Sequence, residues 1–223
     1  MISPFMLPKK RPPFIVLEGG EGSGKSSLLI ALKDELGDAI FTTREPGGSP
    51  YAEVIRTATL KNPLAKTAPP ETTLCLMFAA RFDNVANAIA PALNSGKPVI
   101  SDRFDGSSYA YQIGAQSGGA LEKLFWNLRE RLAIVPDLYI FFDVTPEEGI
   151  RRAHSRNQSL LEGLKDAHQY DHFDDRELKF HRKVRQSYMK FFEKVPHFII
   201  DANQPYEAVK KEFVDKVKEL IEA

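Results

Sequence analysis

The sequence lacks several features that define other classes of protein. Its 223 residues include one cysteine, Cys75, so no internal disulfide can form. Lys plus Arg and Asp plus Glu both number 30, and this balance lacks the basic excess typical of nucleic-acid-binding domains. No apolar run approaches the roughly 20 residues of a membrane span, and none near the N-terminus has the form of a signal peptide. We therefore expect a cytoplasmic protein that has neither nucleic acid nor membrane as a partner.

The chain does have the length and the apolar content, 43%, for one large domain. We expect residues 1–12 to be a flexible N-terminal segment and residues 13–223 to form a single domain. Short apolar segments rich in β-branched residues predict strands at 14–17, 39–42, 98–101, 138–142 and 198–200. Helical patterns lie between them, at 26–36, 51–60, 71–93, 121–133, 146–156, 176–193 and 206–221, and Pro91 should kink or divide the third. The alternation predicts an α/β fold with a five-stranded, mostly parallel sheet and helices on both faces.

A glycine-rich segment directly follows the first predicted strand and matches the pattern G-x-x-x-x-G-K-S. Its glycines allow successive N–H groups to point at phosphate oxygens, and the helix that follows adds its positive dipole end. Lys25 can place a charge against the β- and γ-phosphates, and the Ser26 hydroxyl can bind Mg²⁺. The expected contacts to the nucleotide are Gly19, Gly20, Gly22, Ser23, Gly24, Lys25, Ser26 and Ser27. The pattern predicts a triphosphate site without saying which reaction takes place there.

Charged residues also follow two other predicted strands. The carboxyl ends of the strands in an α/β sheet face the ligand crevice. Asp102 is therefore placed to hold Mg²⁺ or its water, and Arg103 to bind a phosphate with two hydrogen bonds. Arg44 follows the second strand and should point at the same crevice. No N-K-x-D motif is present, which argues against a GTPase.

Several separated motifs resemble those of the thymidylate kinase family, occur in the order expected for that family, and cover most of the length of this chain. They are residues 18–26, the string Thr43-Arg44-Glu45-Pro46-Gly47-Gly48, then 78–81, 102–104, 107–108, 110–112, 142–147 and 200–202. The resemblance implies a P-loop nucleoside-monophosphate kinase fold with a lid at about residues 151–175. It also implies ATP as phosphoryl donor, dTMP as acceptor, Mg²⁺ as cofactor, a homodimer, and a place in dTTP biosynthesis.

The resemblance further implies an acceptor site in which Phe78 stacks on thymine, Arg81 binds its edge and Tyr111 crowds the sugar C2′. Glu21 should approach the sugar 3′-hydroxyl. The remaining expected contacts are Arg44, Pro46, Arg103, Ser107, Ser108 and Gln112. Met77 stands where relatives often have the aromatic residue, and we assign it to the core. Arg56 fits a phosphate contact and a solvated helix face equally well.

The resemblance implies that a lid arginine assists the reaction, because residues 20–23 contain none. The expected catalytic residues are Lys25, Arg103, Arg152 and Arg156, the last two four apart on one helix face. Ala202 should lie near adenine. His172 replaces the usual arginine near the end of the lid. Two alternatives stay open: a kinase for another deoxynucleoside or deoxynucleotide, and a nucleotide-binding switch without catalysis.

Overall fold

The computed structural model describes residues 11–161 and 175–222, with side chains described for 11–155 and 178–222. The predicted lid from 162 to 174, His172 included, and the segment 1–10 lie outside these ranges. Strands β1 (Phe14–Gly19), β2 (Phe41–Arg44), β3 (Val99–Asp102), β4 (Leu138–Asp143) and β5 (His197–Asp201) form one sheet. Their order is β2-β3-β1-β4-β5 and every pairing is parallel, which confirms the predicted α/β class.

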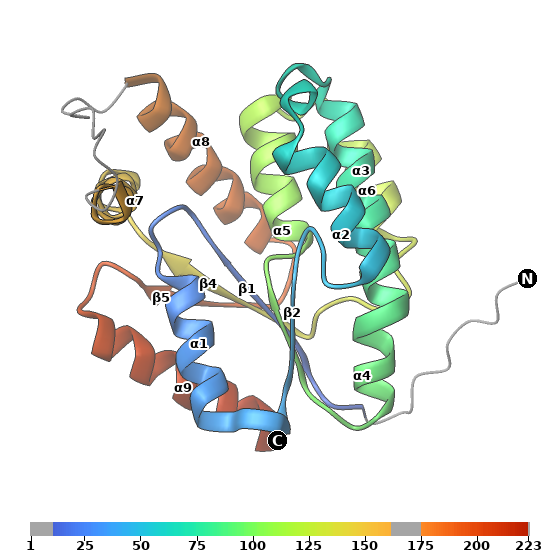
Figure 1. Cartoon of the computed structure of the whole chain (residues 1–223), viewed down its shortest axis with the longest axis vertical. Helices are drawn as coiled ribbons and strands as arrows, with labels where there is room; N and C mark the ends of the chain where they lie inside the picture. The colour runs from blue at the N-terminus through green and yellow to red at the C-terminus, as the bar shows by residue number, and fades with distance from the viewer. Residues whose placement is uncertain (1–10, 162–174, 223) are drawn as a thin grey trace, which may run out of the picture.

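Helices surround the sheet (Figure 1). Their bounds are α1 Lys25–Leu36, α2 Pro50–Arg56, α3 Pro70–Asn84, α4 Ala90–Asn94, α5 Asp105–Ser108, α6 Glu122–Arg129, α7 Pro146–Leu161, α8 Asp175–Phe192 and α9 Tyr206–Glu222. Short 3₁₀ or π segments add η1 Gly37–Ala39, η2 Thr57–Lys61, η3 Pro63–Thr67, η4 Val85–Ile89 and η5 Tyr109–Gln116. None of the helices in the described ranges is long and apolar enough to cross a bilayer.

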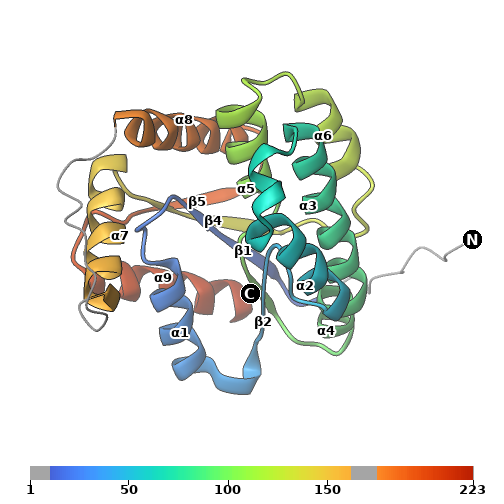
Figure 2. The same ribbon diagram turned by 45° about the horizontal axis from the view of Figure 1, so that its top comes forward.

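Two apolar cores lie against the two faces of the sheet. Successive side chains of a strand point to opposite faces, so Phe14 and Val16 of β1 enter one core and Ile15 and Leu17 the other. Helices α1 and α9 cover the face of Ile15, whereas α3, α4, η5, α6 and α8 cover the face of Phe14 (Figure 2). Because all four side chains are fully buried, β1 is the centre of the molecule, and the loop that follows it starts from a rigid base.

Two predicted elements differ in detail. The second strand begins at Phe41 rather than Ala39, because the 3₁₀ turn η1 occupies residues 37–39. The long helix predicted for 71–93 is divided: Pro91 lies in the first turn of α4, and the wide π-turn η4 precedes it. Proline has no N–H and displaces the carbonyl four residues earlier, which explains the widened turn.

The helical segment formed by α5 and η5 was not predicted. Its sequence, which includes Gly106, Ser107, Ser108 and Gly114, has low helix propensity. Tertiary packing against α8 stabilises it instead. A Cβ atom at Gly114 would collide with the side chain of Ser187, so the glycine permits the close approach of the two helices. This packing brings residues 107–112 to the site described next.

Candidate active site

The loop between β1 and α1 is shaped by its own lysine. Lys25 is buried, and its Nζ donates to the carbonyl oxygens of Gly19 (2.8 Å) and Gly20 (3.1 Å) and to Ser23 Oγ (3.0 Å). Burial, and next the charge of Arg103, lower the pKa of Lys25 to about 7. A cation held this way lacks a full anionic counter-charge. Phosphate groups in the loop would supply it and restore the charged form.

A hollow of about 560 Å³ lies beside this loop. The predicted contacts Gly22, Ser23, Gly24, Ser27, Arg152 and Ala202 line it, together with residues that the prediction did not include, Gln204, Pro205 and Tyr206. Arg152 donates to the carbonyl oxygen of Ala202 (2.8 Å) and to Glu148 (2.7 Å). The hollow thus joins the phosphate loop to the turn after β5, an arrangement that suits a nucleotide whose phosphates lie in the loop.

Helix α7 begins in direct backbone contact with the loop. A Cβ atom on Gly22, which has φ +68°, would collide with the backbone of Gly149, and one on Gly149 would collide with the carbonyl of Glu21. Arg152 is therefore held close to the loop by a glycine–glycine contact. Arg156 belongs to the same helix, but its side chain lies outside the described residues.

Asp102 and Ser26 line a second hollow, on the other side of the loop, of about 640 Å³. Within the described ranges, Asp102 Oδ1 is one of two buried side-chain polar atoms without a hydrogen-bond partner. An unpaired buried carboxylate oxygen is costly, and a cation would relieve that cost. The described residues contain no cluster of three His, Cys, Asp or Glu side chains. A carboxylate and a hydroxyl nevertheless fit Mg²⁺, which usually keeps several waters and takes substrate phosphates as ligands.

Arg44 was predicted to be an acceptor contact, but it lines this second hollow and not the cavity between α3 and η5 that most of the other predicted acceptor contacts line. It pairs in register with Asp102, and its Nη2 lies 3.0 Å from Glu53 Oε2. Because successive side chains alternate along an extended chain, the next residue, Glu45, points into that cavity instead. The loop predicted from the sequence therefore turns Glu45 toward this cavity and Arg44 toward the second hollow.

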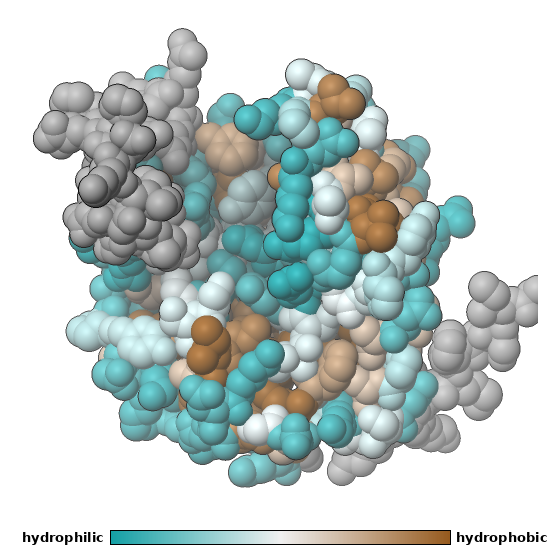
Figure 3. Space-filling view, in the orientation of Figure 1, coloured by the Kyte–Doolittle hydropathy of each residue, from teal (hydrophilic) through white to brown (hydrophobic). Residues whose placement is uncertain are grey.

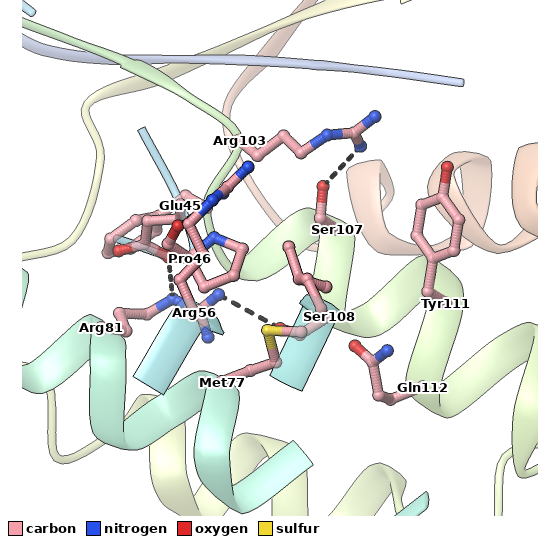
Figure 4. Close-up of a pocket in the computed structure, with 12 residues that line it drawn as sticks. Glu45, Pro46, Arg56, Met77, Arg81, Arg103, Ser107, Ser108, Tyr111 and Gln112 are labelled. Atoms are coloured by element: carbon pink, nitrogen blue, oxygen red, sulfur yellow. Dashed lines mark hydrogen bonds and ion pairs between the residues drawn. The ribbon is translucent and has the colours of Figure 1, made fainter. Parts of the chain in front are cut away.

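A cavity of about 300 Å³ lies between α2 and α3 on one side and α5 and η5 on the other (Figure 4). The predicted residues Pro46, Arg81, Arg103, Ser107, Ser108, Tyr111 and Gln112 line it, and so do Glu45, Arg56, Leu60, Met77 and Phe104. In the same orientation as Figure 1, hydrophilic side chains gather in the middle of the molecular face, where these elements approach the strand ends (Figure 3). The structure thus brings together seven predicted acceptor contacts from four separate segments.

Arg81 is the most constrained side chain of this cavity. It is 2% exposed; its Nε lies 2.7 Å from Glu45 Oε2 and its Nη2 donates to Ser108 Oγ at 3.1 Å (Figure 4). Its Nη1 is the other buried polar atom in the described ranges without a partner. Burial raises the pKa of Glu45 to about 7, although Arg81 opposes the shift. The guanidinium is therefore fixed in place, and one of its donors is left unsatisfied by the described residues.

The placements of Phe78 and Met77 are the reverse of those expected. Phe78 is 1% exposed and lies in the core, with its ring centroid 5.6 Å from that of Phe125. Met77 lines the cavity. On α3 the inward stripe runs through Leu74 and Phe78, four residues apart, which directs Phe78 away from the opening. The Arg81 guanidinium lies 4.6 Å from the Phe78 ring centroid, so this ring supports Arg81 from behind.

Glu21 is also outside the acceptor cavity. It lies against α8, where His181 Nε2 is 3.8 Å from its carboxylate, and it shares a small pocket with His181 and Arg185. Arg185 forms two hydrogen bonds with Asp143 at the end of β4 (2.6 and 2.8 Å). The prediction missed both α8 residues, because a charged amphipathic helix gives no signal that one of its faces meets a phosphate loop.

Arg103 and Arg56 give the cavity its positive charge. The backbone N–H of Arg103 donates to the carbonyl oxygen of Leu17 (2.9 Å), two residues before the phosphate loop. The Arg56 Nη1 donates to the carbonyl oxygen of Pro46 (2.7 Å), and its side chain lines the cavity, which favours the phosphate-contact interpretation left open by the sequence. A glycine-rich phosphate loop beside a second cavity lined by arginines is the arrangement of a P-loop nucleoside-monophosphate kinase.

Comparisons with known proteins narrow that class. The family model described as thymidylate kinase matches residues 17–213. A thymidylate kinase of Chlamydia caviae is 39% identical over 201 residues, covering 87% of this chain and 91% of the relative. One from Bradyrhizobium is 39% identical over 217 residues, covering 94% and 91%. The crystal structure of thymidylate kinase from Ehrlichia chaffeensis superposes with a TM-score of 0.68 at 25% identity, covering 92% of this chain and 98% of that one. The chain belongs to the thymidylate kinase family and is a phosphotransferase.

Proposed function

We propose that this protein transfers the γ-phosphoryl group of ATP to the 5′-phosphate of dTMP, giving ADP and dTDP, and so contributes to dTTP biosynthesis. Family membership supports this activity, and the presence of separate hollows beside the phosphate loop and between α3 and η5 supports two substrates bound at once. ATP would occupy the loop and the hollow beside α7, while dTMP would occupy the cavity between α3 and η5. The 300 Å³ cavity is of the size expected for a small ligand.

One observation carries the proposal: the acceptor arginine is tied to the donor loop. The amide of Arg103 is hydrogen-bonded to β1 just before that loop, and its side chain lines the acceptor cavity. A phosphate held by Arg103 would therefore lie beside the triphosphate end of the donor. Holding two reactants in place in this way is the main contribution that an enzyme makes to phosphoryl transfer.

The individual roles follow from the contacts. Lys25 would bind the β- and γ-phosphates, while Arg103 and Arg56 would bind the acceptor phosphate, and Arg152 would add charge from α7. Arg81 would use Nη1 to hydrogen-bond an oxygen on the edge of the base. Asp102 and Ser26 would hold Mg²⁺, which when bound neutralises charge on the transferring phosphates.

We propose further that residues 13–223 act as one catalytic unit, that the protein is a homodimer, and that it works in the cytoplasm, where both nucleotides are found. The exposed apolar side chains of α2 and η3, Tyr51, Val54 and Leu64, support the dimer, because a second copy of the chain could cover them. Sedimentation of the purified protein tests the dimer.

The activity is tested by incubating the purified protein with ATP, Mg²⁺ and one acceptor at a time, and by quantifying each product. When dTMP is the acceptor, we expect ADP and dTDP to form in equal amounts. We expect little turnover of dGMP, dAMP or thymidine. The Lys25→Ala variant should turn over almost none of any acceptor. Equal or faster turnover of thymidine or of a purine monophosphate would identify another acceptor. ATP binding without any phosphorylated product would identify a switch instead.

A further inference from the structure

Arg103 has the one positive φ angle, 69°, among the non-glycine residues of the described ranges. A non-glycine residue in this region is uncommon, and such strain persists only where the surroundings determine it. Two backbone contacts hold the residue: its N–H donates to Leu17 O (2.9 Å) and its carbonyl accepts from Ser101 Oγ (2.7 Å). The left-handed turn aims the side chain from the end of β3 into the acceptor cavity. The guanidinium therefore needs a second set of contacts to fix it there.

A fully buried carboxylate lies directly beneath that turn. Glu18, the penultimate residue of β1, is 0% exposed and accepts four hydrogen bonds. The amides of Phe104 (3.0 Å) and Ser107 (2.9 Å) donate to Oε1, while the hydroxyls of Ser107 (2.7 Å) and Tyr188 (2.9 Å) donate to Oε2. Burial raises the pKa of Glu18, and the charge of Arg103 and these hydrogen bonds oppose the shift.

The same two hydroxyls bind the arginine. The Arg103 Nη1 donates to Ser107 Oγ at 3.0 Å and to Tyr188 Oη at 3.2 Å. Each hydroxyl donates a hydrogen bond to the Glu18 carboxylate and accepts one from the guanidinium, so the two bonds polarise each other. Within the described residues both contacts use Nη1, which leaves the rest of the guanidinium for an anion in the cavity. A direct ion pair between Glu18 and Arg103 would instead use the paired N–H groups with which a guanidinium binds an anion.

Tyr188 reaches this point from helix α8. Its ring is fully buried, stacked on Phe192 at 5.9 Å between centroids and packed on Phe141 at 5.1 Å. Removing its hydroxyl would leave this ring packing in place while removing one partner each from Arg103, Glu18 and Ser107. The hydroxyl is therefore separable from the core that surrounds it.

We propose that Glu18 and Tyr188 are positioning residues for Arg103: the buried carboxylate, acting through the hydroxyls of Ser107 and Tyr188, fixes the guanidinium to receive the phosphate of the acceptor. This inference rests on the proposed function for the identity of that acceptor. Both residues should therefore affect binding of the ligand's phosphate and leave binding of its base and sugar unchanged.

The experiment compares dTMP with thymidine, which has the same base and sugar but no phosphate. Dissociation constants of both are measured by titration calorimetry for the wild-type protein, Tyr188→Phe and Glu18→Gln. We expect both variants to bind dTMP about tenfold more weakly and thymidine unchanged, because a hydrogen bond that orients a charged group is lost. The KM for ATP should not change.

Tyr109→Phe is the matched control, since Tyr109 is also buried and also donates its hydroxyl to a carboxylate, Glu122, at 2.8 Å. It should leave both affinities unchanged. Equal weakening of dTMP and thymidine in Tyr188→Phe and Glu18→Gln, or no change in either ligand, would overturn the inference and leave the proposed function intact. A wild-type protein that binds no dTMP would overturn the proposed function itself.

Discussion

At the scale of single residues, the site depends on groups that the folded protein leaves incompletely satisfied. Among the described residues, Asp102 Oδ1 and Arg81 Nη1 are buried without hydrogen-bond partners, and the buried amine of Lys25 is bonded to carbonyls and a hydroxyl of its own loop. Burying such groups opposes folding, and a nucleotide with its metal ion supplies the missing partners. The cost in stability is thus the counterpart of affinity for charged ligands.

The lowered pKa of Lys25 leads to a measurable proton uptake. With a pKa of about 7 in the free protein, Lys25 is mostly neutral at pH 8, whereas the phosphates of bound ATP should keep it charged. Binding of a non-hydrolysable ATP analogue at pH 8 should therefore take up close to one proton, and affinity should fall as pH rises above 7. Calorimetry in buffers of different ionisation enthalpy measures the uptake.

Lys25→Arg is the control for this prediction, because a guanidinium stays charged at both pH values. Its binding should take up less than the wild-type amount by about one proton. The same uptake in both proteins would show that the proton goes elsewhere, for example to the analogue.

At the scale of elements, the strand ends were predictable and the helix faces were not. The phosphate loop, Asp102 and Arg103 could be located because an apolar strand followed by polar residues is a local pattern. The choice between Phe78 and Met77 depended on which side of α3 meets the core. The spacing to Arg81, three residues for one and four for the other, places both on the same side of the helix and does not decide between them. Helix α8 contributes His181 and Tyr188. These contributions depend on tertiary contacts with residues more than 150 positions earlier in the sequence.

The start of α7 gives a prediction at this scale. Replacing Gly by Ala inside a helix normally stabilises it by about 1 kcal/mol. In Gly149→Ala the new methyl group would collide with the carbonyl of Glu21 and displace α7, with Arg152, from the loop. We expect a KM for ATP raised severalfold, an unchanged KM for dTMP, and no gain in thermal stability. A higher melting temperature with unchanged kinetics would show that the contact between α7 and the loop does not position Arg152.

At the scale of the whole molecule, the order of the strands places the chemistry. β1 lies between β3 and β4, so the loop after β1 has Arg103, which follows β3, on one side and Asp143 of β4 on the other. The net charge is zero, but Arg56, Arg81 and Arg103 line the acceptor cavity, where Glu45 is the one acidic residue among the described residues that line it. A chain without excess charge can thus present a positively charged cavity, because three of its arginines meet at this end of the strands.

The central claim is that two phosphate sites adjoin across Arg103. A crystal structure with ADP, Mg²⁺ and dTMP tests it most directly. We predict that the dTMP phosphate contacts Arg103 and faces the phosphate loop, with the base beside Arg81. An acceptor phosphate bound away from Arg103, with no open path to the terminal phosphate of the donor, would contradict the account.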